Sequence, residues 1–214
     1  MPEFPDADDR NALAEDCRRC PALAEHRTRI AWGNGPRDAD LVVVGEAPAA
    51  GDPDADRWQG GNHTGLAYTS RHSGRKVRRL VDDLDYGDAY YTNAVKCFPA
   101  DPANRSGPHG PTDNREPTAE ERANCRPYLV GEIETVAPRA VLGTGKHATQ
   151  SVLAAEGRSL DDGFLDAVTD TVALPGLETT LVPVLHPSYE EVWRARLGYH
   201  ERADYVAAVR AALP

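Results

Sequence analysis

The sequence has no long hydrophobic run. No apolar stretch approaches the roughly 20 residues of a membrane-spanning helix. The first ten residues are acidic and lack the basic and apolar regions of a signal peptide. We therefore expect a soluble cytoplasmic protein with no membrane partner.

Basic residues are also few. The chain has 24 Lys and Arg residues and 34 Asp and Glu residues, which gives a net charge of −10. DNA-binding proteins usually present a basic face, so this balance argues at first against a nucleic-acid partner. Only Lys76, Lys96 and Lys146 are lysines. An acidic, lysine-poor composition is typical of adaptation to concentrated salt, although an acidic protein from a GC-rich genome would share it. Net charge therefore leaves the partner open.

The length of 214 residues suits one globular domain, residues 1–214. Apolar runs predict four strands, and periodic patterns between them predict helices. The strands are expected at 41–44, 89–92, 140–142 and 180–184, and the helices at 11–29 (interrupted at Cys20-Pro21), 73–84, 117–136, 147–153 and 202–213. This alternation predicts the α/β class with a mainly parallel sheet.

The cysteines number four, and in a reducing cytoplasm they are not expected to form disulfides. Cys17 and Cys20 form a C-x-x-C pair, while Cys97 and Cys125 lie far downstream. Four thiolates suit an all-cysteine zinc site or an iron–sulfur cluster, and spacing alone does not choose between them. Two buried free thiols beside a chance pair are the simpler alternative.

Polar and glycine residues follow the predicted strands, at Glu46, Asn93, Gly143-Thr144-Gly145 and His186. In open α/β sheets the chemistry lies at the carboxyl ends of the strands. Each residue alone has an ordinary structural role: Asn93 as a turn cap, His186 as a turn histidine, Glu46 as an acid at a helix start. Their joint occurrence favours a functional site.

Four motifs in order carry a resemblance to a known family. The sequence from about Cys17 to the C-terminus resembles the iron–sulfur uracil-DNA glycosylases, the fourth and fifth families of that superfamily. The motifs are Gly45-Glu46-Ala47-Pro48, Thr92-Asn93-Ala94-Val95-Lys96-Cys97, Asn124-Cys125-Arg126-Pro127 and His186-Pro187-Ser188. The resemblance implies a three-layer α/β/α fold with a central four-stranded parallel sheet. It also implies a [4Fe–4S] cluster on Cys17, Cys20, Cys97 and Cys125, and excision of uracil from DNA by a monomer.

The resemblance also assigns roles to pocket residues, because such enzymes flip the target nucleotide out of the stack. Asn93 would pair with uracil N3–H and O4, whose donor and acceptor order is reversed in cytosine. Tyr68 would stack on the base, and the main-chain amide of Ala47 would contact it. His186 would donate to uracil O2 as negative charge builds there, and Glu46 would orient the attacking water.

Two departures leave the breadth of substrates open. The fourth family usually has Gly-Arg-Pro-Phe where this chain has Gly65-Leu66-Ala67-Tyr68, and Ala49 replaces a glycine. The fifth family draws its acid from the segment that aligns near Arg71, whereas the acid here is Glu46. Alternatives are a broader glycosylase that also accepts hypoxanthine or xanthine, a non-catalytic iron–sulfur DNA-binding or redox-sensing module, and a zinc-stabilised interaction protein.

The densest basic cluster begins a predicted helix, where Arg71, Arg75 and Lys76 are expected to contact DNA phosphates. Arg78 and Arg79 in the same helix fit a solvated face equally well. After His186, Arg194 is expected to contact DNA, and Leu197 to enter the duplex as an apolar wedge. His109 is expected to be an ordinary loop residue.

Overall fold

The computed structural model describes residues 2–103, 112–160 and 163–214. The strands are β1 Leu41–Gly45, β2 Ala89–Asn93, β3 Ala140–Thr144, β4 Val172–Leu174 and β5 Thr179–Val184. The helices are α1 Pro21–His26, α2 Gly61–Thr64, α3 Ser73–Leu84, α4 Ala119–Val136, α5 Lys146–Leu153, α6 Glu190–Arg196 and α7 Arg202–Ala212. Four strands and four helices therefore lie where the sequence patterns predict them, with ends differing by up to two residues.

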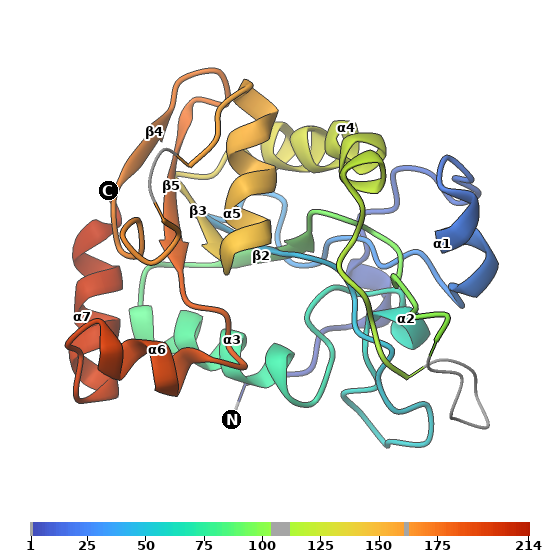
Figure 1. Cartoon of the computed structure of the whole chain (residues 1–214), viewed down its shortest axis with the longest axis horizontal. Helices are drawn as coiled ribbons and strands as arrows, with labels where there is room; N and C mark the ends of the chain where they lie inside the picture. The colour runs from blue at the N-terminus through green and yellow to red at the C-terminus, as the bar shows by residue number, and fades with distance from the viewer. Residues whose placement is uncertain (1, 104–111, 161–162) are drawn as a thin grey trace.

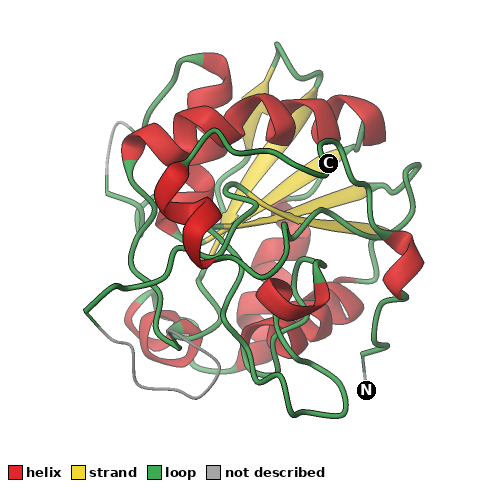
Figure 2. Ribbon diagram, turned by 90° about the vertical axis from the view of Figure 1, so that its right-hand side faces the viewer, coloured by secondary structure: helices red, strands yellow, loops and turns green. Residues whose placement is uncertain are grey.

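The sheet has the strand order β2-β1-β3-β5-β4, and its first four strands are parallel. This confirms the predicted α/β fold with a four-stranded parallel sheet. The short β4 adds an antiparallel strand at one edge. Helices cover both faces of the sheet, as Figures 1 and 2 show.

Alternating side chains in β1 explain the two helical layers, since successive residues of a strand point to opposite faces. Leu41 and Val43 pack in a core cluster with residues of α3 and α7. Val42 and Val44 pack in a second cluster with residues of α4 and α5. A strand buried on both faces has an unbroken apolar sequence, as this one does.

The register of the parallel strands brings their carboxyl ends to one edge of the sheet. Gly45 pairs with Asn93, and Thr144 pairs with Val184. Glu46 follows the first of these strands, and His186 lies two residues beyond Val184. Four chain segments that are distant in the sequence therefore meet at this edge.

The expected helix over 11–29 is wrong in its first half. Within residues 11–29 only α1 is helical. Before it, the Asn11 amide donates to the Gly33 carbonyl at 2.8 Å. This bond fixes the chain to a neighbouring segment and leaves 11–20 as turns and irregular structure. The sequence patterns also do not predict α2, α6 or β4. In the described part of the chain, no helix is long and apolar enough to cross a membrane.

Candidate active site

A pocket of about 180 Å³ opens at the carboxyl edge of the sheet. Its lining includes all five residues to which sequence reasoning assigned catalysis or base binding: Glu46, Ala47, Tyr68, Asn93 and His186. Backbone and side-chain groups of Gly45, Thr144 and Ser188 complete the same wall. Segments at the ends of β1, β2 and β5 thus supply acid, amide and imidazole groups, and Tyr68, between α2 and α3, supplies the phenol.

Gly45 makes room for the Asn93 amide. A β-carbon added at Gly45 would lie 2.3 Å from Asn93 Oδ1 and 2.8 Å from Tyr68 Oη. Both distances are too short for real contacts, so any larger residue would displace the amide. Asn93 is only 4% exposed, and it is one of the residues that line the pocket. Its donor and acceptor are therefore available to a ligand in the pocket.

The backbone of Asn93 is held by a buried ion pair. Lys96 Nζ lies 2.5 Å from Glu132 Oε2 and donates to the Asn93 carbonyl and the Thr92 hydroxyl at 2.6 Å each. Glu132 also accepts from the Tyr90 hydroxyl at 3.2 Å and from the Gly33 amide at 3.1 Å. Because these partners satisfy both charges, the network fixes the end of β2 in one position.

Tyr68 is oriented by a hydrogen-bond chain that leads to the sheet. Its hydroxyl lies 2.5 Å from Thr144 Oγ1, and Thr144 donates its own proton to the Val44 carbonyl at 3.0 Å. Tyr68 is therefore the donor in the first bond, and burial raises the pKa of its phenol, which keeps this proton in place. Arg78 Nε donates to the Tyr68 carbonyl at 3.3 Å, and Tyr68 adopts a positive φ of 55°.

His186 has its tautomer set by the backbone. The Ser188 amide donates to His186 Nδ1 at 3.2 Å, so in the neutral ring the proton lies on Nε2. Burial lowers the pKa of His186, and His147 and His72 lower it further. The neutral ring therefore presents an Nε2–H donor at neutral pH.

Glu46 is half-buried at the mouth of the pocket. Burial raises the pKa of its carboxyl group, Glu116 raises it too, and His147 and Arg122 oppose the shift. Its backbone carbonyl accepts from the Val95 amide at 2.9 Å, which fixes the turn after β1. A carboxyl group with a raised pKa beside a neutral imidazole is suited to acid–base work on a bound ligand.

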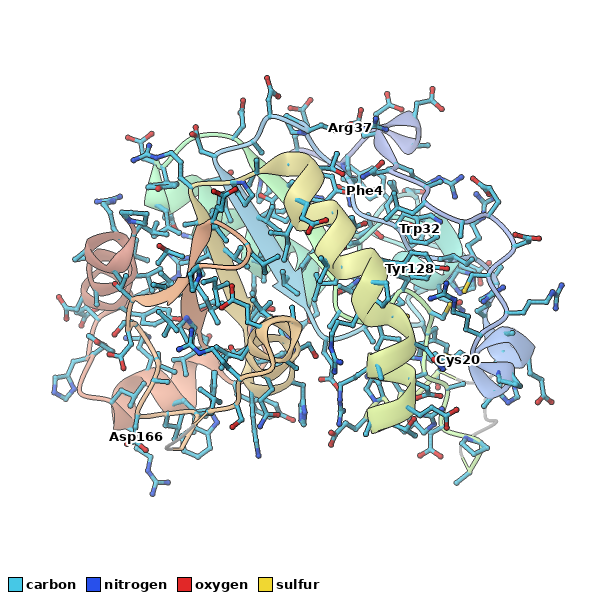
Figure 3. The ribbon with its side chains drawn as sticks, turned by 90° about the horizontal axis from the view of Figure 1, so that it is seen from above. Phe4, Cys20, Trp32, Arg37, Tyr128 and Asp166 are labelled. Atoms are coloured by element: carbon cyan, nitrogen blue, oxygen red, sulfur yellow. The ribbon has the colours of Figure 1, made fainter. Side chains whose placement is uncertain are left out.

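The four cysteines gather in one apolar cluster, against which Ala47 of the pocket also packs. Cys97 and Cys125 are each 6% exposed and pack with Leu23 and Trp32, while Cys17 and Cys20 border the same cluster. Figure 3 shows Cys20, Trp32 and Tyr128 together at one end of the molecule. Burial raises the pKa of the Cys125 thiol to about 11.

Two of the cysteine sulfurs accept hydrogen bonds from side-chain N–H groups. Arg27 Nη1 lies 3.4 Å from Cys97 Sγ, and Asn124 Nδ2 lies 3.5 Å from Cys20 Sγ. Within residues 2–103, 112–160 and 163–214, no three His, Cys, Asp or Glu side chains converge on the position of one metal ion.

Comparison with known proteins agrees with this arrangement. The family model of the uracil DNA glycosylase superfamily matches residues 32–213. The chain belongs to this superfamily. A Type-5 uracil-DNA glycosylase of Pyrobaculum aerophilum is 32% identical over a match that covers 64% of this chain and 65% of that relative, slightly less than two thirds of its length.

Relatives of the other type match over more of their length. A Type-4 uracil-DNA glycosylase of Thermotoga maritima is 30% identical, with 83% of this chain and 80% of the relative covered. A Type-4 enzyme of Pyrobaculum aerophilum is 29% identical, with 82% and 80% covered. The mixed character seen in the motifs is thus reflected in relatives of both types.

The acid in this superfamily member's pocket is Glu46. Arg71, which aligns near the acid of the fifth family, is exposed and lies outside the pocket lining. Sequence reasoning did not assign roles to Thr144, Lys96 or Glu132. Thr144 lies in the Gly143-Thr144-Gly145 turn noted at the end of β3. Glu132 lies within α4, and no pattern in the sequence indicates that it contacts Thr92 and Lys96.

The residues predicted to contact DNA divide into two groups. Arg71 and Arg75 are exposed at the start of α3. In contrast, Lys76 Nζ donates to the Pro187 carbonyl at 3.2 Å, and Arg194 Nη1 donates to the Tyr199 and His200 carbonyls at 2.9 and 2.6 Å. Lys76 and Arg194 therefore support the turns on either side of α6.

Other predictions in these segments have different outcomes. Arg78 is 8% exposed and donates to Asn34 Oδ1 at 2.9 Å, so it is a buried structural residue and not part of a solvated face. Leu197 is partly buried and packs against the core, whereas Tyr189 and Val192 on and beside α6 are 60% and 69% exposed. The wedge role of Leu197 stays a prediction. His109 lies outside the described residues.

Proposed function

We propose that the chain is a uracil-DNA glycosylase that hydrolyses the bond between uracil and deoxyribose and leaves an abasic site. The observation that supports this most is the pocket of about 180 Å³ in which Glu46, Tyr68, Asn93 and His186 meet. A single flipped base is the ligand that such a pocket suits. We further propose that residues 1–214 act as one domain.

In the proposed reaction, water attacks C1′ of the deoxyribose while the C1′–N1 bond breaks. The bonding electrons leave with uracil and accumulate at O2, where the neutral His186 Nε2–H donates a hydrogen bond. Glu46 takes up the proton that the water loses as its oxygen bonds to C1′, and before that its negative charge offsets the positive charge that develops on the sugar. Tyr68 stacks on the base, and the Ala47 amide contacts it.

The activity is tested with a fluorescent oligonucleotide that holds one uracil, followed by alkaline cleavage of abasic sites. The proposal expects a cleaved product from the wild-type protein at low or molar potassium chloride. Absence of product at every salt concentration, from protein with all its iron present, would favour a non-catalytic DNA-binding module instead.

Replacing Asn93 by Ala should reduce uracil excision by roughly 10- to 100-fold, because two hydrogen bonds to the base are lost. The same variant is compared on oligonucleotides that hold hypoxanthine or xanthine. Uracil-selective recognition predicts a loss confined to uracil. An equal loss on every base would show that Asn93 shapes the pocket without reading the base.

We also propose that Cys17, Cys20, Cys97 and Cys125 hold a [4Fe–4S] cluster. The donor set fits, since all four are thiols in an apolar shell and two sulfurs accept N–H donors. These four thiolates would bind the iron atoms of the cluster. A zinc site requires four sulfurs at about 2.3 Å from a single point. When bound, the cluster would supply structural cross-linking of α4 to the N-terminal segment.

Replacing Cys97 by Ser should lower the melting temperature by about 5 °C or more, because a metal group bound only by the folded state stabilises it. Purified wild-type protein is expected to be brown, with iron and sulfide in equal amounts, and the variant paler. Excision per folded molecule should change little. A colourless wild-type protein that contains zinc would contradict the cluster.

A further inference from the structure

A groove of about 890 Å³ continues outward from the pocket. The two spaces share five lining residues, so the groove begins at the catalytic groups themselves. The shared residues are Glu46, Asn114, Thr144, His186 and Ser188. A ligand that fills the pocket can therefore extend into this groove.

Beyond the residues shared with the pocket, the groove is lined by three aromatic side chains. Phe164 and Trp193 are partly buried and pack against the core, which holds their rings in place. Tyr189 is 60% exposed, and its ring centroid lies 5.9 Å from that of His186. Figure 3 places Asp166, another lining residue, at the end of the molecule opposite Cys20. This groove is thus distinct from the cysteine cluster.

The charges of the groove indicate what kind of group it accepts. Its lining carries three carboxylates, Glu46, Glu116 and Asp166, against the two permanent cations Arg115 and Lys146. Arg115 is already engaged by both oxygens of Glu121, at 2.6 and 2.8 Å, and Glu116 is paired with Arg122 at 2.9 Å, which leaves Glu46 and Asp166 against Lys146. Such a balance does not attract phosphates, whereas a neutral base with a π-face stacks well on aromatic rings.

We infer that the groove binds the base of a nucleotide adjacent to the target uracil, stacked on Tyr189, in a single-stranded stretch of DNA. This inference rests on the proposed function and adds a second base-binding subsite to it. The neighbouring base can stack on Tyr189 only if it is not stacked on other bases in a duplex. The subsite therefore favours single-stranded over fully paired substrate.

The inference is tested by pairing a protein change with a substrate change. Single-stranded oligonucleotides carry one uracil, with the base of the 5′ or the 3′ neighbour replaced by a tetrahydrofuran abasic analogue. Uracil release under single-turnover conditions is measured for wild type, Tyr189→Ala, Tyr189→Phe and the control Leu13→Ala, which alters another exposed apolar residue.

Wild type should lose roughly tenfold in rate when the base on one side is absent. On the intact oligonucleotide, Tyr189→Ala should release uracil about tenfold more slowly than wild type. Removal of the neighbouring base should not lower the rate of this variant further. Tyr189→Phe and Leu13→Ala should resemble wild type. This coupling should persist in molar potassium chloride, because stacking releases no counterions.

Two results would overturn the inference. The first is a wild-type rate that does not depend on either neighbouring base. The second is a rate that Tyr189→Ala and base removal each lower by the same factor whether or not the other change is present. Both leave the glycosylase proposal intact, because uracil is still released. Failure of wild type to release uracil from the intact oligonucleotide would overturn the proposed function as well.

Discussion

Replacing Glu46 by Gln should lower the single-turnover rate of uracil release by roughly 100- to 10,000-fold. The amide keeps the size of the side chain but cannot accept a proton from water or offset positive charge on the sugar. Glu46 lines the pocket together with His186 and Asn93, so the loss should be in the chemical step and not in DNA affinity. The matched control is Glu191→Gln, an exposed glutamate in α6.

The pH dependence gives a second readout of the same variant. Burial raises the pKa of Glu46, and a base must be ionised to act. The wild-type rate should therefore fall as the pH drops through this raised pKa, at a higher pH than an ordinary glutamate would give. The Gln variant should lack that ionisation. If the rate of Glu46→Gln still falls at low pH as the wild-type rate does, the ionisation belongs to another group.

Stability separates a catalytic loss from misfolding. A glutamate whose pKa is raised in the fold contributes stability in its protonated form, which is lost as the pH rises through that pKa. Above that pKa the ionised Glu46 thus destabilises the protein, and Gln removes this cost. The melting temperature of Glu46→Gln should equal or exceed that of wild type. A clear decrease would show that Glu46 has a structural role.

The sheet and the pocket could be predicted largely because both depend on local patterns. Short apolar runs specify strands buried on both faces, and parallel strands bring their carboxyl ends to one edge. Glu46, Asn93 and His186 follow such runs directly, so their meeting follows from the alternation of strands and helices. Tyr68 could be predicted only from the resemblance, since it follows no strand.

Contacts between distant segments could not be predicted in this way. The bond between Tyr68 and Thr144 joins residues 76 positions apart, and the ion pair of Lys96 with Glu132 spans 36. Neither pair has a periodic signal, because tertiary packing alone brings them together. The helix expected over 11–20 is absent although Ala12, Leu13 and Ala14 favour a helix, and the Asn11 amide instead bonds to the distant Gly33 carbonyl.

Replacing His186 by Ala should lower the rate of uracil release by roughly 100- to 1,000-fold, the loss typical of one donor to a developing oxyanion. His186→Gln should recover part of the rate, because an amide N–H still donates. His200→Ala, which alters an exposed histidine beyond α6, is the control. Equal rates for His186→Ala and wild type would exclude a donor role.

The protonation state of His186 can be tested without turnover. Burial lowers the pKa of the ring, so it should be neutral at pH 7 and become charged only as the pH falls through that lowered value. Because the Ser188 amide donates to Nδ1, ¹⁵N chemical shifts of the ring should show the proton on Nε2. A neutral donor stabilises charge on uracil O2 while it is forming, without pairing to a full charge in the resting enzyme. A spectrum showing the Nδ1–H tautomer, or a doubly protonated ring at pH 7, would contradict this role.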